Sequence, residues 1–139
     1  MSSYLVTGGA GFIGSHLVMR LLHDGHYVRI VDNLVTGSHA NLPEPGRVDF
    51  IEADLANAEI AQKAVQGMEF VLHQAAIPSV PRSVSDPATS HRANVDATLN
   101  LLCAARDAKV ARLIFAGSSS VYGDTPQLPK NESMAHDGR

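Results

Sequence analysis

The sequence has only one cysteine, Cys103, so an internal disulfide cannot form. A single cysteine is typical of a reducing compartment, and we therefore expect a cytoplasmic protein. No apolar run approaches the roughly 20 residues needed to cross a bilayer. The first residues lead directly into a predicted strand, so we expect no signal peptide. The formal net charge is −3, so charge gives no reason to expect binding to nucleic acid or to a membrane surface.

The composition is that of a globular protein. Hydrophobic residues make up 45% and charged residues 18% of the 139 positions, a length typical of one domain. Apolar runs that read as strands alternate with helical or connecting segments five times. The predicted strands are residues 4–7, 27–31, 48–52, 69–73 and 112–116. This alternation predicts an α/β fold with a doubly wound parallel sheet (a Rossmann fold) in the strand order 3-2-1-4-5.

A glycine-rich turn joins the first predicted strand to the first predicted helix. Gly8, Gly11 and Gly14 lie in this turn, and the helical pattern begins at Phe12. Backbone N–H groups and the positive end of the helix then surround one point, which suits a pyrophosphate. Gly8 and Gly11 allow a tight turn and close approach, and Gly14 lets the helix pack against the strand. A glycine spacing alone is weak evidence for a dinucleotide site. The alternative is therefore a turn that has only a structural role.

Two acidic positions follow the next strands. Asp32 ends the second strand, 18 residues after Gly14. A carboxylate there can accept hydrogen bonds from ribose hydroxyls and repels a 2′-phosphate, which favours NAD over NADP. The alternative for Asp32 is an ordinary turn acid. Asp54 and Leu55 follow the third strand, where they either reach an adenine ring or form a helix cap, and the sequence leaves both readings open.

The fourth strand ends in small residues and leads into an irregular segment. Ala75 and Ala76 leave space for a flat ligand, or simply pack closely. His73 has no second histidine or cysteine nearby at ligand spacing, so we predict a packed or hydrogen-bonded histidine and no metal site. Residues 77–85 are predicted to be an irregular loop over the ligand. Arg82 is the only cation in this loop and suits a phosphate, although a lone arginine is often merely solvated.

A long helix is predicted from Pro87 to Val110, with Asp86 as its N-cap. Its apolar residues form two sides: Val95, Leu99 and Leu102 on one, and Ala97, Leu101, Ala104 and Ala108 on the other. Such a helix packs against two surfaces. One is the sheet. The second surface is either a helix that this chain lacks or a second subunit, in a homodimer formed through helix 87–110. The alternative is that neighbouring parts of the same chain cover the helix. Cys103 is predicted to be core packing.

Three serines follow the fifth strand, at positions 118, 119 and 120. Hydroxyls at the carboxyl end of a strand in an open α/β sheet face the ligand crevice. The alternative is a serine-rich turn without a ligand. No further helix or strand is predicted after this run, so the fifth strand is expected to be an exposed edge.

The motifs together resemble the extended short-chain dehydrogenase/reductase family of NAD-dependent nucleotide-sugar epimerases and dehydratases. The similarity runs from Val6 to about Glu132. It rests on TGGAGFIGSHL (7–17), Asp32-Asn33-Leu34 with Thr36-Gly37, Asp54-Leu55, HQAA (73–76), PRSVSDP (81–87), Asn94 and SSSVYGD (118–124). The HQAA…SVPRSVSDP stretch and DTPQLPK (124–130) are most similar to UDP-glucose and UDP-N-acetylglucosamine 4-epimerases.

This resemblance implies a tightly held NAD that takes a hydride from C4 of a UDP-sugar; the 4-keto sugar turns and takes the hydride back. It assigns cofactor binding to Gly8, Gly11, Phe12, Ile13, Gly14, Asp32, Asn33, Gly37, Asp54, Leu55, Ala75, Ala76 and Asn94. It places Ser79, Arg82, Ser119 and Ser120 near the substrate. It assigns the catalytic hydroxyl, which hydrogen-bonds the reacting oxygen, to Ser118.

Two departures qualify what the resemblance implies. Dehydratases of the family carry an acidic pair after the catalytic hydroxyl, whereas this sequence has Ser119 and Ser120, which favours an epimerase over a dehydratase. A dehydratase or another reductase of the family is kept as an alternative. The family's Tyr-x-x-x-Lys pair is expected past residue 132 and is missing; Tyr122 is followed four residues later by Pro126. We therefore expect an incomplete NAD-binding domain (1–123) and an irregular tail (124–139), truncated before the substrate domain and inactive alone. A non-catalytic NAD-binding module is the alternative.

Overall fold

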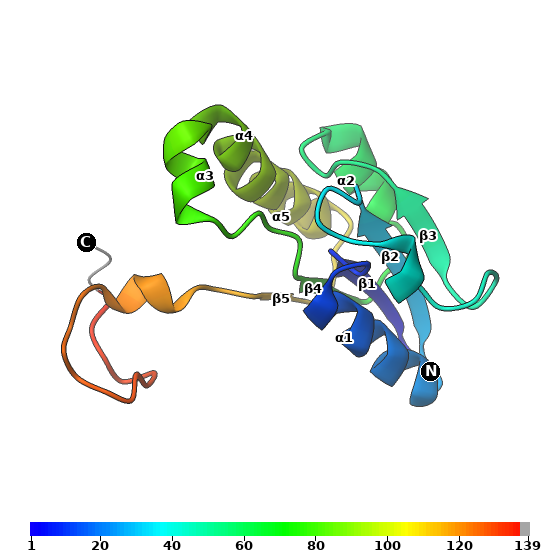
Figure 1. The fold of residues 1–139 in the computed structure, drawn as a ribbon. Helices are drawn as coiled ribbons and strands as arrows, with labels where there is room; N and C mark the ends of the chain where they lie inside the picture. Colours follow the sequence, from blue (N-terminus) through cyan, green and yellow to red (C-terminus); the bar gives the residue numbers. More distant parts are fainter. Residues whose placement is uncertain (137–139) are drawn as a thin grey trace.

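The computed structural model describes residues 1–136 and shows one parallel sheet with helices on both faces (Figure 1). The strands are β1 (Ser3–Thr7), β2 (Tyr27–Asp32), β3 (Asp49–Glu52), β4 (Phe70–His73) and β5 (Arg112–Phe115). They pair in the order β3-β2-β1-β4-β5, and every neighbouring pair is parallel. The predicted doubly wound fold and strand order are confirmed.

The helices connect these strands. They are α1 (Phe12–His23), α2 (Ala58–Val65), α3 (Val80–Ser85), α4 (Pro87–His91) and α5 (Ala97–Asp107), with a π-helical segment η2 (Arg92–Asp96) between α4 and α5. Short 3₁₀ helices lie at η1 (His39–Asn41) and η3 (Ser119–Tyr122). The predicted helix 87–110 is thus the run α4–η2–α5, which ends at Asp107, three residues earlier than predicted. It begins as expected, because the Asp86 carboxylate accepts a hydrogen bond from the Thr89 N–H at 3.1 Å.

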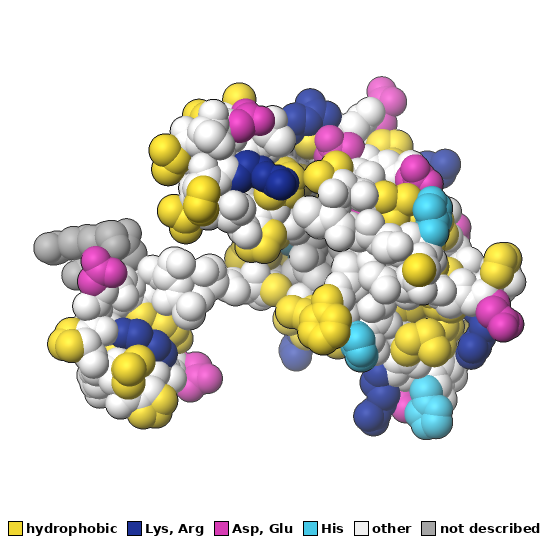
Figure 2. All heavy atoms as spheres, in the orientation of Figure 1, with side chains coloured by type: hydrophobic (Ala, Val, Ile, Leu, Met, Phe, Trp, Pro, Cys, Tyr) yellow, Lys and Arg dark blue, Asp and Glu magenta, His cyan; other side chains and the backbone are white. Residues whose placement is uncertain are grey.

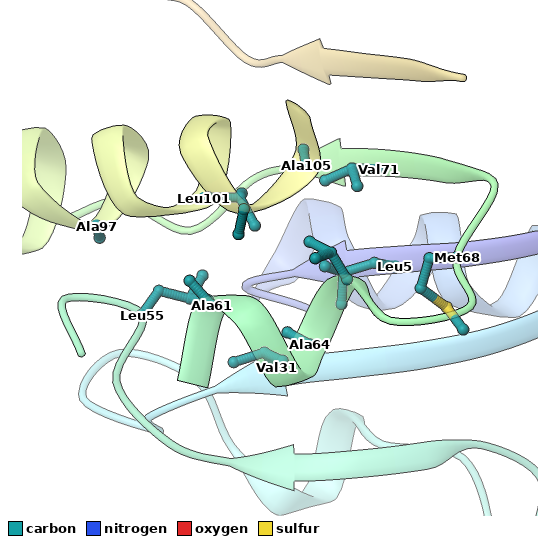
Figure 3. Close-up of a cluster of buried hydrophobic side chains, with 12 residues drawn as sticks. Leu5, Val31, Leu55, Ala61, Ala64, Met68, Val71, Ala97, Leu101 and Ala105 are labelled. Carbon is teal, nitrogen blue, oxygen red and sulfur yellow. The ribbon is translucent and has the colours of Figure 1, made fainter. Parts of the chain in front are cut away.

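The core has one cluster on each face of the sheet, because successive strand residues point to opposite sides. Leu5 of β1 packs toward α2 and α5, in a cluster that includes Val31 and Leu101 (Figure 3). Val6, the next residue, packs with Val18 of α1 on the other face. These two clusters hold α2 and α5 on one face of the sheet and α1 on the other. The carboxyl ends of β1, β2 and β4 are left accessible between the two layers of helices.

The α4–η2–α5 run buries only one of its two apolar sides. Ala97, Leu101 and Ala104 are buried, as predicted, whereas Ala108 is exposed at the helix end. The second side is uncovered: Val95, Leu99 and Leu102 are 49%, 58% and 47% exposed. Cys103 lies on this exposed part, so its predicted place in the core is wrong. The apolar pattern identified a helix with two packing faces, but only contacts from other elements decide which face is covered.

Short helices lie in the segment 77–85, which was predicted to be irregular, and in the serine run, where no helix was predicted. Within residues 77–85 the chain forms α3, whose Ser79 hydroxyl accepts a hydrogen bond from the Arg82 N–H at 3.3 Å. The serine cap and the early proline make this turn favourable despite its weak apolar pattern. The serine run forms η3 in the same way, capped by Ser118.

The end of the described chain leaves the sheet. β5 is an edge strand as predicted, and its Ile114 and Phe115 are 53% and 56% exposed. Residues 124–136 contain no helix or strand and run away from the sheet in orange and red (Figure 1). The last three residues of the predicted tail lie outside the described part. Within residues 1–136, no helix has the length and apolar character needed to span a membrane.

Candidate functional site

A cleft of about 450 Å³ lies at the carboxyl ends of β1, β2 and β4 and beside the residues that follow β3. Its volume falls in the range of small-molecule sites, and its position is that of ligands in open α/β sheets. Its walls include Gly8, Gly11, Phe12, Ile13, Gly14, Asp32, Asn33, Asp54, Leu55, Ala75, Ala76, Ser79 and Arg82. Thirteen of the residues predicted for cofactor or substrate are therefore brought together in one cavity.

The glycine turn forms the centre of the cleft and depends on two glycines for its shape. Gly8 has a φ of +67°, and a Cβ there would lie 2.8 Å from the Cα of Ala75. A Cβ on Gly14 would collide with the carbonyl oxygen of Gly8. Side chains at either position would therefore push the turn, the helix or the end of β4 apart.

The first turn of α1 presents free hydrogen-bond donors to this cleft. Its N-cap residue, Gly11, has no side chain to satisfy them. Within residues 1–136, the backbone N–H groups of Phe12, Ile13 and Gly14 have no hydrogen-bond partner. Since these donors lie at the positive end of a 12-residue helix, the site favours an anion.

Asp32 is nearly buried, at 9% exposure, and is held in one orientation. Its Oδ2 accepts the Ala10 N–H at 2.9 Å, and its Oδ1 accepts the Leu34 N–H at 2.8 Å. Each carboxylate oxygen keeps a further lone pair for a ligand hydroxyl. Gly37 lies behind this group rather than in the cleft wall: a Cβ there would be 3.0 Å from Asp32 Oδ1. Its small size lets the following loop close against the carboxylate.

Asp54 is not the N-cap of α2, so the helix-cap alternative for this residue is wrong. The N-cap is Asn57, whose Oδ1 accepts the Glu59 N–H at 2.9 Å. Asp54 instead accepts the Ala56 N–H at 2.9 Å and pairs with Arg92 of η2, whose nearer guanidinium nitrogen is 3.0 Å away. Arg92 was not singled out from the sequence, because nothing local to it indicates a partner 38 residues earlier.

The segment after β4 forms the opposite wall. Ala75 and Ala76 line the cleft, together with Ser79, the N-cap of α3, and Arg82 of α3. The α3–α4 segment also carries exposed hydrophobic side chains, seen in yellow in Figure 2, and Val80 is 76% exposed. Asn94 is not in the cleft wall: its side chain clamps Ile77, accepting the N–H at 2.8 Å and donating to the carbonyl at 3.2 Å.

The three serines do not line the cleft. They follow β5, next to β4, but all are exposed. The Ser118 hydroxyl accepts the Ser120 N–H at 3.2 Å and thereby caps η3. In the described structure Ser118 therefore has a local capping role, and its catalytic role remains a prediction.

His73 is packed and hydrogen-bonded, as predicted. It is 1% exposed, and its ring nitrogens contact the hydroxyls of Thr7 and Thr98 at 2.6 and 2.9 Å. Burial lowers the pKa of His73 from 6.5 to about 4, so the ring is neutral at pH 7. Among residues 1–136, no cluster of three or more histidine, cysteine, aspartate or glutamate side chains is arranged to bind a metal.

Comparison with known proteins agrees with this geometry. The pattern that describes the NAD dependent epimerase/dehydratase family matches residues 4–138. The chain belongs to this family. A UDP-glucose 4-epimerase of Klebsiella pneumoniae is 40% identical over 136 residues, which cover 93% of this chain and 98% of that protein. A probable UDP-arabinose 4-epimerase of Arabidopsis thaliana is also 40% identical, over 90% of this chain but 33% of its own length.

Solved structures of UDP-glucose 4-epimerases share the fold. The UDP-glucose 4-epimerase of Stenotrophomonas maltophila, with bound NAD and formylated UDP-arabinopyranose, superposes with a TM-score of 0.89 at 34% identity. The Thermus thermophilus UDP-glucose 4-epimerase in complex with NAD gives 0.87 at 41% identity. The matched regions cover 99% and 97% of this chain but only 43% and 44% of those chains. The chain thus spans less than half the length of these solved relatives.

Proposed function

We propose that this chain is the NAD-binding portion of a nucleotide-sugar 4-epimerase. The observation that carries the proposal is the pairing, in one cleft, of unpartnered N–H groups at the start of α1 with the anchored carboxylate of Asp32, both within the described residues 1–136. The first feature suits a pyrophosphate and the second suits ribose hydroxyls. Their combination is the recognition chemistry of a dinucleotide, and NAD is bound in the solved Stenotrophomonas and Thermus relatives.

The residues of the cleft fit this cofactor. The N–H groups of Phe12 and Ile13 would hold the pyrophosphate, and Asp32 with Asn33 would hold the adenosine ribose. Asp54 and Leu55 would lie beside the adenine, and the segment after β4 beside the other nucleotide. Bound NAD would supply a hydride acceptor for C4 of a UDP-sugar. Ser79 and Arg82, on the rim formed by α3, are the proposed contacts to the substrate side.

NAD is proposed rather than NADP because Asp32 carries a negative charge where NADP would place a 2′-phosphate. We expect titration calorimetry to show NAD binding and much weaker NADP binding. Replacing Asp32 with Asn keeps the size but removes the charge and one of the two acceptors for the Ala10 and Leu34 N–H groups, so NADP should gain relative to NAD. Loss of the charge-assisted bonds should weaken NAD by roughly 10- to 100-fold. Asp107→Asn, at an exposed residue on the far end of α5, is the matched control. Preference of the unaltered protein for NADP would contradict the proposal.

Turnover is a separate question from binding. No tyrosine in the 139 residues is followed four positions later by a lysine, the pair that the family resemblance assigns to proton transfer. We therefore propose that the chain alone binds NAD without interconverting UDP-glucose and UDP-galactose, as a non-catalytic binding module would. Ser119 and Ser120 make a dehydratase less favoured. An assay of the purified chain with each sugar tests this, and measurable turnover would refute it.

We further propose that the chain forms a homodimer through the uncovered side of the helical run η2–α5. Val95, Leu99 and Leu102 are each about half exposed on this side, and burying such a stripe against its own copy would remove apolar surface from water. Sedimentation should show a dimer that Leu99→Lys converts to a monomer. A monomer at all accessible concentrations would contradict this. We also propose a cytoplasmic location, on the basis of the single cysteine in the sequence.

A further inference from the structure

A continuous chain of hydrogen bonds connects the end of β1 with the segment after β4 that forms one wall of the cleft. It begins at Thr7, the last residue of β1 and the residue before the glycine turn. The Thr7 hydroxyl contacts His73 Nδ1 at 2.6 Å, and His73 Nε2 contacts the Thr98 hydroxyl at 2.9 Å. The Thr98 hydroxyl donates to the Asn94 carbonyl at 2.7 Å, and the Asn94 side chain clamps Ile77.

The direction of each bond follows from the donors available. The Asn94 carbonyl can only accept, so Thr98 must use its one hydroxyl hydrogen there. Thr98 therefore accepts from His73, which places the ring hydrogen on Nε2. His73 Nδ1 is then an acceptor for the Thr7 hydroxyl hydrogen. The Thr7 hydroxyl thus donates its hydrogen to His73, and its oxygen accepts the N–H groups of Gln74 and Ala75.

These hydrogen bonds hold both ends of the backbone segment 74–77, which forms one wall of the cleft. At one end, the Gln74 and Ala75 N–H groups donate to the Thr7 oxygen at 3.2 and 3.1 Å. At the other end, Asn94 holds Ile77 by both its N–H and its carbonyl. His73 joins these two clamps and is itself 1% exposed. Residues 74–77 are thus held at both ends by groups that the imidazole ties together.

We propose that His73, through Thr7 and Thr98, is a positioning residue that sets the half of the cleft formed by residues 74–79. This inference rests on the proposed function, because that half would face the second nucleotide of NAD. Asp32 and Asp54 lie on the other side of β1, beside the adenosine half. Disturbing the imidazole bridge should therefore weaken binding of the whole dinucleotide more than binding of ADP, which would occupy the adenosine half alone.

The test uses Thr98→Val, which keeps the side-chain shape but removes the hydroxyl that joins His73 to Asn94. Thr98→Ser keeps the hydroxyl and is the matched control. By calorimetry, Thr98→Val should bind NAD about tenfold more weakly, because the hydroxyl that is removed makes two hydrogen bonds, one with His73 and one with the Asn94 carbonyl. The ADP affinity of Thr98→Val should differ from that of the unaltered protein by less than about twofold. Thr98→Ser should bind NAD as the unaltered protein does. An equal loss for NAD and ADP, or no loss, would overturn the proposal.

A second measurement does not depend on the cofactor. In the ligand-free protein, amide hydrogen exchange at Ile77 should be about tenfold faster in Thr98→Val than in Thr98→Ser. Exchange at Leu34, whose N–H is bonded to Asp32 on the other side of the cleft, should be unchanged. Equal acceleration at both amides would mean general destabilisation and would refute the positioning role. If the unaltered protein binds neither NAD nor ADP, the proposed function fails while the exchange result still decides this inference.

Discussion

Acidification should destabilise this protein through His73, which is buried in the folded chain. Burial lowers the pKa of His73 from 6.5 to about 4, and its hydrogen-bond partners are threonine hydroxyls. Between these values the unfolded chain binds a proton that the folded chain does not. Stability is therefore complete above pH 6.5, falls as the pH falls, and levels off below about pH 4. At about 1.36 kcal/mol per pH unit, the free energy of unfolding should drop by about 3 kcal/mol across this window.

Urea unfolding at a series of pH values between about 7 and 4 measures this slope. His73→Gln removes the buried titrating group, so its free energy of unfolding should start lower at neutral pH but change much less with pH. His23→Gln, at an exposed residue near the end of α1, is the matched control and should keep the slope of the unaltered protein. The remaining groups are common to all three proteins, so the difference between slopes reports His73. If the unaltered protein and His73→Gln lose stability in parallel, the assigned buried and neutral state of His73 is wrong.

Two further predictions test the glycine turn and the helix packing. Gly14→Ala should abolish most NAD binding, because its Cβ would collide with the Gly8 carbonyl oxygen; calorimetry checks this, and retained affinity would show that the turn adapts freely. Leu101→Ala should lower the free energy of unfolding by about 2–5 kcal/mol, because Leu101 is fully buried. Leu99→Ala, at a residue 58% exposed on the same helix, should cost less than about 0.5 kcal/mol at monomeric concentrations, and similar losses for both would contradict the assigned faces.

Much of the fold could be predicted because its signals are local. Alternating apolar strands and helices indicated the sheet order, and the cap at Asp86 marked the start of a helix. The short helices α3 and η3 were not predicted, because turns of so few residues held by a serine cap leave little periodicity. Cys103 was placed in the core wrongly, since an apolar helix pattern does not show which side other elements cover.

The sequence by itself determined the glycine turn and the acid that follows the second strand, because each depends on residues adjacent in the chain or at the end of one strand. Only the tertiary structure decided that Asn94 holds Ile77 rather than lining the cleft, and that Arg92 pairs with Asp54. It also joined Thr7 to His73 across 66 positions. A threonine or histidine within a strand pattern carries no mark of its distant partner. The parallel pairing of β1 with β4 creates that contact by placing both strand ends side by side.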